Sequence, residues 1–132
     1  MPVDGSPPSL RALRHVARSR RDAPVEVLVL NVQAGIPVSR FVTRAMIREY
    51  HERHAEEALR PARELIQRLK LAAECYMRVG DIPATIVDFA RETGCGEIVM
   101  GARGLGRVAG LFVGSVATRV VHLAKVPVTL VK

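Results

Sequence analysis

The sequence contains no tryptophan, and its 132 residues include only two tyrosines and three phenylalanines. A core built from this chain must therefore be aliphatic, and hydrophobic residues do supply 48% of the sequence. Aliphatic strands of this kind suit a parallel sheet that is buried between helices. No apolar run approaches the roughly 18 residues of a membrane-spanning helix, so we expect no contact with a membrane.

Cysteine is equally scarce. Cys75 and Cys95 are the only two, and they lack the C-x-x-C spacing of a redox or zinc motif. The opening stretch MPVDGSPPSL has neither the charged start nor the apolar centre of a secretory signal. These features predict a cytoplasmic protein with reduced thiols.

Acidic residues are outnumbered, 13 against 20 lysines and arginines, which gives a formal net charge of +7. Such an excess is compatible with a polyanionic partner. The arginines are spread along the chain, however, and many share predicted helices with glutamate or aspartate. We therefore interpret the charge as solvated helix surface and do not expect nucleic acid as the primary ligand.

Catalytic and metal-binding patterns are also missing. His51 and His54 stand three residues apart on a probable helix, but no cysteine or second cluster completes a set of four metal ligands. No Ser-His-Asp arrangement or carboxylate pair stands out, so we predict no metal site made by the chain and no dedicated catalytic residues.

What the sequence does contain is an alternation of helices and strands. Ser6 followed by two prolines predicts a helix that runs to about Arg20. Asp81 is the expected N-cap of a second helix, which Gly94 ends, and a third follows a glycine-rich loop. Strands are predicted at residues 25–32, 73–79, 97–100 and 126–131, and the polar–apolar alternation of 73–79 places that strand near a sheet edge.

The stretch between residues 34 and 70 is harder to interpret. Its pattern is helical from Ser39 onward, but Pro61 should kink the helix or mark a break just before it. We expect an irregular or loosely held segment over residues 34–54, followed by a firm helix to about Lys70. Together these elements predict a single α/β domain with a parallel sheet and helices on both faces.

Five glycines fall in the stretch MGARGLGRVAGLFVGSVATRVV, residues 100–121, at positions 101, 104, 106, 110 and 114. The stretch joins a predicted strand to a predicted helix, where exposed backbone N–H groups and the helix N-terminus favour an anion. It is not a Walker A loop, because the chain has no G-K-[ST], and it does not match G-x-G-x-x-G. Taken alone, such a loop indicates flexibility as readily as phosphate binding.

The spacing Gly101-x2-Gly104-x9-Gly114-Ser115 resembles the ATP-binding signature of the universal stress protein family. The similarity extends to PVDGS at 2–6, VGDIPATIVDFA at 79–90, EIVMGARG at 97–104 and KVPVTLVK at 125–132. It covers nearly the whole chain except about residues 33–57, a region that varies in the family. The resemblance implies an open five-stranded parallel sheet in the order 3-2-1-4-5.

The resemblance also implies an ATP pocket, with a Mg or Mn ion on the phosphates. Asp4 should contact adenine or ribose beside Pro2, and Val32 should line the adenine slot. Met100 and Gly101 should close the ribose side. The remaining residues match positions that hold phosphates: Arg103, Gly104, Gly114, Ser115 and Val116. Gly106 and Gly110 are interpreted as turn residues.

Some of these residues have plainer alternatives. Asp4 could cap the first helix or brace a turn, and Ser115 could cap the last helix. The first strand is also truncated, since only three residues precede Asp4 and an average strand has about 5–6. A start site upstream of Met1, a strand from another chain and a true stub would each explain this, and we favour the first.

The sequence therefore predicts an ATP-binding regulatory protein of the stress response. It would form a homodimer through the terminal strand at 126–131, because exposed sheet edges pair readily and members of the family pair there. The alternatives left open are a nucleotide-independent dimerising adaptor, a slow ATPase and a binder of another adenine nucleotide such as cyclic AMP.

Overall fold

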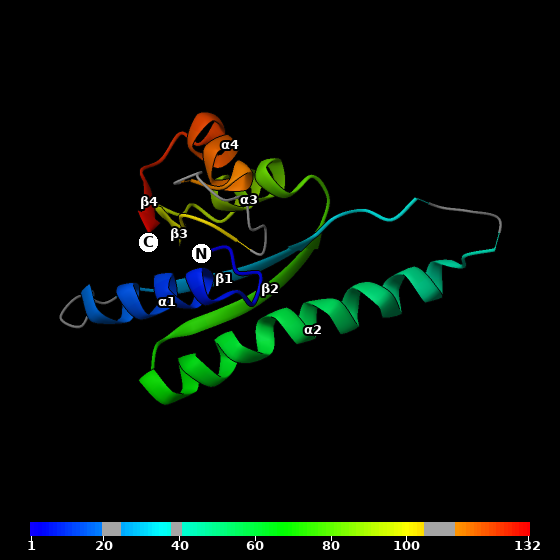
Figure 1. The fold of residues 1–132 in the computed structure, drawn as a ribbon, viewed down its shortest axis with the longest axis horizontal. Helices are drawn as coiled ribbons and strands as arrows, with labels where there is room; N and C mark the ends of the chain where they lie inside the picture. The colour runs from blue at the N-terminus through cyan, green and yellow to red at the C-terminus, as the bar shows by residue number, and fades with distance from the viewer. Residues whose placement is uncertain (20–24, 38–40, 105–112) are drawn as a thin grey trace.

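A computed structural model describes residues 1–19, 25–37, 41–104 and 113–132, and all structural statements concern these residues. Helices and strands alternate along the chain, as the sequence predicts (Figure 1). The elements, in order, are α1 Pro7–Ser19, β1 Val27–Gln33, α2 Arg44–Leu69, β2 Ala73–Val79, α3 Ile82–Glu92, β3 Ile98–Gly101, α4 Ser115–Leu123 and β4 Val128–Val131.

Every strand pair is parallel. β1 pairs with β2 from Val27 opposite Ala73 to Gln33 opposite Val79, and β3 pairs with β4 over four residues of each strand. Within the described residues, the strands thus form two two-stranded sheets, and the full order 3-2-1-4-5 is not confirmed. β2 has β1 as its one strand partner there, which agrees with its predicted place near an edge.

Residues 1–3 lie along β1 and are joined to it by an isolated bridge. Pro2 forms one parallel bridge with Leu30, through a bond from Val3 N–H to the Leu30 carbonyl and one from Leu30 N–H to the Met1 carbonyl, each 2.8 Å. The Met1 amino group donates to the Leu28 carbonyl at 2.6 Å, and burial lowers the pKa of that amino group to about 6. This stretch therefore belongs to the strand layer.

The helices cover two sides of the strands. α1 and α2 pack on one side and α3 and α4 on the other (Figure 1). Each pair has its own aliphatic cluster, with Leu13 and Leu59 in the first and Ile86 and Val120 in the second. No helix in the described ranges is both long and apolar enough to cross a membrane.

The prediction of an irregular segment over residues 34–54 is wrong for its second half. α2 begins at Arg44, where the side chain of Thr43 accepts a hydrogen bond from Met46 N–H at 3.2 Å. The helix then continues without a break through Pro61. A buried stripe runs along it on both sides of the proline: His51, Ala55, Leu59, Ala62 and Leu65. This packing holds the helix together although proline removes one backbone donor.

Other local predictions are confirmed. The Ser6 side chain accepts from Ser9 N–H at the start of α1, and Asp81 caps α3 by accepting from Ala84 N–H at 3.2 Å. Gly94 follows α3 with a φ of +67°, a conformation that glycine adopts without strain. Gly106 and Gly110 lie outside the described residues.

Candidate functional site

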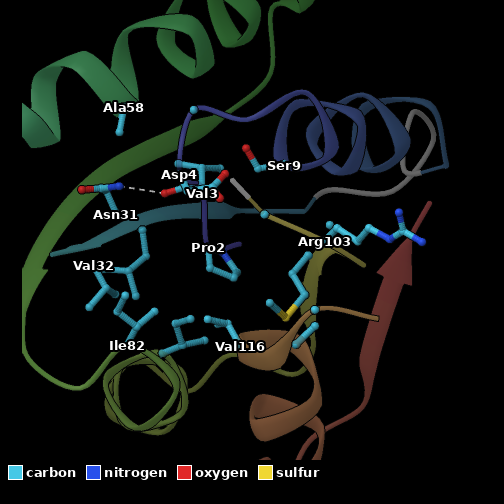
Figure 2. Close-up of a pocket in the computed structure, with 18 of the residues that line it drawn as sticks. Pro2, Val3, Asp4, Ser9, Asn31, Val32, Ala58, Ile82, Arg103 and Val116 are labelled. Carbon is cyan, nitrogen blue, oxygen red and sulfur yellow. Dashed lines mark hydrogen bonds between the residues drawn. The ribbon is translucent and has the colours of Figure 1, made fainter. Parts of the chain in front are cut away.

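A cavity of about 770 Å³ opens at the carboxyl ends of β1 and β3 (Figure 2). This is where ligands bind in open α/β proteins. Its walls come from the N-terminal stretch, β1, α2, α3, the loop after β3 and the start of α4. All ten residues predicted for the site line it: Pro2, Asp4, Val32, Met100, Gly101, Arg103, Gly104, Gly114, Ser115 and Val116.

The middle of the cavity is apolar. Val32 on β1 faces the same space as Ile82 on α3 and Val116 on α4 (Figure 2), and Met100 closes it from β3. The polar residues that also line the cavity include Asp4, Gln33, Arg103 and Ser115. A largely apolar slot with a few polar groups around it is the usual form of a small-molecule site.

Gly101 at the end of β3 and Gly104 in the loop after it both lie very close to other parts of the chain. A Cβ atom added at Gly101 would lie 2.8 Å from the carbonyl carbon of Pro8, closer than real Cβ contacts. At Gly104 it would lie 2.6 Å from Oδ2 of Asp4. The loop after β3 therefore packs directly on the start of α1 and on the carboxylate of Asp4. The approach to the Pro8 backbone explains Gly101, whether or not a ligand also needs it, whereas the end of the Asp4 side chain could move away from a Cβ atom at Gly104.

The start of α4 presents backbone N–H groups to the cavity. Gly114 occupies the N-cap position with extended backbone and forms no side-chain cap. Its own N–H is taken by the Ala102 carbonyl at 2.8 Å, but Ser115 and Val116 are the first two residues of the helix, whose N–H groups have no acceptor within it. Ser115 is therefore not the helix cap, and it lines the cavity.

Asp4 braces a turn, one of the roles expected for it. Its Oδ1 accepts from the backbone N–H of Ser6 at 3.0 Å and from the Ser6 hydroxyl at 2.5 Å. Gly5 completes the turn with a φ of +79°, and a Cβ there would lie 3.2 Å from Cα of Ala58 on α2. The turn thus holds the Asp4 carboxylate between α2 and Gly104 in the loop after β3, which we call the glycine loop.

Several lining residues were missed from the sequence. His54 lies in the segment that was expected to be irregular, whereas Glu57 and Ala58 fall in the predicted helix, where nothing in the sequence indicated that they would face a cavity. Asn31 and Gln33 stand two apart on β1, and that spacing could have placed them on one face of the strand. Ile82 directly follows Asp81, the predicted N-cap of α3, so its place at the start of that helix could have been predicted from the sequence.

The described residues contain no cluster of three or more His, Cys, Asp or Glu that could hold a metal ion. His54 Nδ1 lies 2.8 Å from the Tyr50 carbonyl, and neither ring nitrogen of the buried His51 has a partner there. His51 and His54 therefore lie on one helix, α2, as predicted. In the described residues they are not grouped with further metal ligands.

Parallel strands, helices on two sides and a cavity at the strand ends define an α/β protein of the open-sheet class. The model of the universal stress protein family matches residues 1–132. A curated relative, universal stress protein MJ0531 of Methanocaldococcus jannaschii, is 32% identical over 139 residues, covering 100% of this chain and 79% of the relative. The chain belongs to the universal stress protein family.

Solved structures agree with this assignment. Hypothetical protein MJ0577 superposes with a TM-score of 0.80 at 26% identity, covering 99% of this chain and 92% of that one. The universal stress protein from Archaeoglobus fulgidus in complex with dAMP gives 0.69 at 30% identity, covering 99% and 94%. A universal stress protein in complex with cAMP gives 0.71 at 26% identity, covering 100% and 94%.

Proposed function

We propose that this protein is a cytoplasmic regulatory module of the stress response that binds ATP in the cavity at the strand ends. The observation that carries the proposal is the convergence of the glycine loop, the start of α4 and an apolar slot on one cavity of about 770 Å³. Relatives were solved with dAMP and with cAMP, which supports an adenine nucleotide as the ligand class.

In this proposal the phosphates lie against the glycine loop. The N–H groups of Ser115 and Val116, the Ser115 hydroxyl and the helix N-terminus would favour negative charge there. Arg103 is exposed and lines the same cavity, but its side chain extends away from the apolar slot (Figure 2), so its guanidinium would have to turn inward to add a charged donor. The base would occupy the apolar slot between Val32 and Ile82.

A Mg or Mn ion on the phosphates fits the residues that line this end of the cavity. Such ions are commonly held by phosphate oxygens, water and one or two carboxylates. Asp4 packs against Gly104 and lines the cavity; it would contact the adenine or the ribose, while the phosphate oxygens and water would hold the ion. When bound, the ion would neutralise phosphate charge.

The first experiment is to purify the protein without added nucleotide, denature it and identify any released small molecule by mass spectrometry. ATP near one equivalent per chain is the expected result, and adding ATP at about 100 times its Kd should stabilise the empty protein by about 2.7 kcal/mol. Another adenine nucleotide in its place would favour the cyclic AMP alternative. Release of ADP over hours would indicate slow hydrolysis.

An empty protein that gains no stability from ATP, ADP, AMP or cyclic AMP would instead support the nucleotide-independent adaptor. Ser115→Ala provides a matched variant, because it removes one hydroxyl from the cavity at a position that is not the helix cap. It should weaken ATP binding while leaving the melting temperature of the empty protein nearly unchanged.

We further propose that β4 and the residues before it, 126–131, form the interface of a homodimer. β4 pairs along one side with β3, and in the described residues no strand lies along its other side. An open edge of this kind can pair with a second copy. Light scattering at micromolar concentration should give the mass of a dimer, and a monomer would rule the interface out.

The sheet order 3-2-1-4-5 is part of the same proposal. It counts residues 1–3 as the first strand, so the strands would lie side by side in the order β2, β1, residues 1–3, β3 and β4. Val3 belongs to the same buried cluster as Val99 of β3 and Val29 of β1. Slow hydrogen exchange of the Val3 amide, comparable to that of β1 amides, is expected from this placement.

A further inference from the structure

β2 is a seven-residue strand with one open edge. It pairs with β1 from Ala73 to Val79, and within the described residues no strand lies along its other side. None of its residues is fully buried, and Val79 is 46% exposed. A strand in the middle of a covered sheet is buried at most positions, as β1 is. The outer edge of β2 is therefore accessible to a partner.

The pairing with β1 determines which backbone groups of β2 face outward. At one end Val27 N–H donates to the Ala72 carbonyl at 3.2 Å, and at the other Gly80 N–H donates to the Gln33 carbonyl at 2.9 Å. Backbone groups of successive residues in a strand point to opposite sides, so the even-numbered residues of this stretch face β1. The odd-numbered residues direct their N–H and C=O groups to the open edge, where they form a template for another strand.

Two charged side chains stand on this strand, with Tyr76 midway between them. Glu74 and Arg78 are both exposed, and they lie on the same face of the strand as Tyr76. Arg78 lies over the Phe89 ring of α3, 5.3 Å from its centroid, so this is the α3 face of the sheet. In the part of the chain that the structure describes, neither charged side chain takes part in an ion pair. The Tyr76 hydroxyl donates to one oxygen of Glu74 at 2.5 Å, which leaves the other oxygen for a cation.

This spacing is self-complementary about Tyr76. If two copies of β2 pair antiparallel with their Tyr76 residues opposite each other, each Glu74 lies opposite the Arg78 of the other copy. These are non-hydrogen-bonded positions, where Cα atoms are about 4.5 Å apart and side chains are closest. The outward-facing residues then occupy the hydrogen-bonded positions, with Cys75 opposite Met77 and Ala73 opposite Val79.

Other registers lose this match. A shift by one residue sets outward-facing backbone groups against inward-facing ones and breaks the hydrogen bonding. A shift by two residues keeps the backbone bonds but places a charged side chain opposite Tyr76. Parallel pairing of two copies in register would set like charges side by side, which is unfavourable. The antiparallel register centred on Tyr76 is therefore the one that satisfies both the backbone and the charges.

We propose that the outer edge of β2 is an interface with a second copy of this chain, formed by antiparallel pairing about Tyr76 and specified by its two Glu74–Arg78 contacts. Charged side chains commonly protect an open edge from other chains. Here the same charges disfavour mismatched strands and fit this one. In the sheet order proposed above, β4 lies at the opposite edge, so both interfaces can form and would join β4 dimers into a row. Nucleotide binding plays no part in this pairing.

The test is disulfide trapping in the full chain, with Cys75→Ala and Cys95→Ala as the background. Tyr76→Cys places a thiol on the two-fold axis, opposite its own copy and within the Cα separation that a disulfide spans. Mild oxidation should therefore give covalent dimers on a non-reducing gel.

Glu74→Cys in the same background is the matched control. It lies on the same strand and face, but the two copies of residue 74 would be about 14 Å apart along the paired strands, so this variant should not cross-link by itself. Mixing it with Arg78→Cys should give covalent dimers, because these two positions lie opposite each other and the second Glu74–Arg78 contact is kept.

Charge reversal gives an independent measurement by sedimentation velocity over a range of protein concentrations. Glu74→Arg sets guanidinium groups opposite each other at both contacts and should weaken this association by about tenfold or more, as should Arg78→Glu. An equimolar mixture of the two variants should form mixed pairs in preference to unmixed ones. Glu52→Arg, an exposed charge reversal on α2, is the control and should leave association unchanged. Pairing through β4 alone would give mixed and unmixed dimers in the statistical ratio.

The absence of cross-links both in Tyr76→Cys and in the mixture of Glu74→Cys with Arg78→Cys would mean that β2 does not pair in this way. Equal cross-linking of Glu74→Cys by itself would also contradict the pairing, since it would indicate random collision. Should Tyr76→Cys fail to fold after losing the contact of its ring with Phe89, the mixture at the two exposed positions still decides the case.

Discussion

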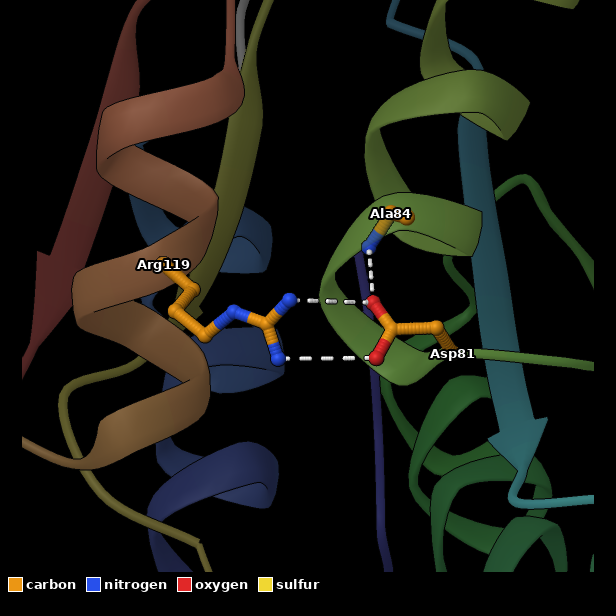
Figure 3. Close-up of polar contacts among 3 residues, drawn as sticks. All are labelled: Asp81, Ala84 and Arg119. Carbon is orange, nitrogen blue, oxygen red and sulfur yellow. Dashed lines mark hydrogen bonds and ion pairs between the residues drawn. The ribbon is translucent and has the colours of Figure 1, made fainter.

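Arg119 on α4 reaches across to Asp81, the N-cap residue of α3, with two hydrogen bonds of 3.4 and 3.5 Å (Figure 3). The same carboxylate caps α3 through Ala84 N–H. Both side chains are about half exposed, and the two contacts are long. The contact therefore links α4 to α3, but solvent screens the attraction between the two charged side chains.

This geometry predicts that the cap matters more than the ion pair. Asp81→Ala should lower the free energy of unfolding by about 1 kcal/mol, the usual effect of losing an N-cap. Arg119→Ala should change it by less than about 0.5 kcal/mol, because exposed ion pairs contribute little. Urea titration measures both. Asp81→Asn keeps the cap without the charge and should resemble Arg119→Ala; if it resembles Asp81→Ala, the ion pair dominates.

Gly101→Ala and Gly104→Ala should have different consequences. The methyl group at Gly101 meets the backbone of Pro8, which cannot move without displacing α1, so stability should fall by about 1–3 kcal/mol. At Gly104 it meets the end of the Asp4 side chain, which can rotate. Stability should fall by less than about 1 kcal/mol, while ATP affinity falls roughly tenfold because the displaced carboxylate enters the cavity.

Thermal melts with and without ATP distinguish the two cases. Gly96→Ala is the control, since nothing lies within 4 Å of its added Cβ atom, and it should leave both stability and binding near those of the wild type. Equal destabilisation by all three substitutions would contradict the close packing of the loop on Pro8 and Asp4.

Pro61→Ala should stabilise the protein. Residue 61 lies within α2, where proline leaves the carbonyl four residues earlier without its helical donor. Alanine restores that donor, and the expected gain is about 1–3 kcal/mol, the lower end allowing for the freer unfolded chain. Denaturant unfolding provides the measurement. A loss of stability would mean that the ring of Pro61 packs in a way that alanine cannot replace.

The difference in burial between Leu13 and Leu123 makes a further prediction. Leu13 is fully buried between α1 and the strands, so Leu13→Ala should cost about 2–5 kcal/mol through lost burial and the cavity left behind. Leu123 near the end of α4 is 45% exposed, and Leu123→Ala should cost less than about 1 kcal/mol. Comparable losses at the two positions would contradict the burial described for Leu13.

The sequence was most informative where one local signal decides the structure. The Asp81 cap, the Gly94 end and the aliphatic run of β1 each have a single strong interpretation, and these elements appear where they were predicted. The site residues could be placed because the glycine spacing resembles a known signature over an ordered set of motifs. All ten line one cavity, although their roles toward a nucleotide stay a prediction.

The sequence failed where long-range packing overrides a local signal. Pro61 suggests a break, but burial of Leu59 before it and Leu65 after it keeps α2 intact. The hydrogen bonds from Gln33 to Asn31 and from Asn31 to the Val3 carbonyl could not be predicted either, because they depend on which strand the N-terminal stretch joins. A sequence can show that Asn31 is polar in an apolar strand, but not which carbonyl it will meet.

The single bridge between Pro2 and Leu30 has a thermodynamic consequence. Residues 1–4 supply a wall of the cavity, and they are attached to β1 by this bridge, by the Met1 amino group on the Leu28 carbonyl and by the amide of Asn31 on the Val3 carbonyl. The docked and undocked forms of this stretch are therefore linked to ligand binding: any ligand that touches Pro2 or Asp4 also favours docking. A ligand in the cavity should then increase the protection of residues 1–4 against proteolysis and hydrogen exchange.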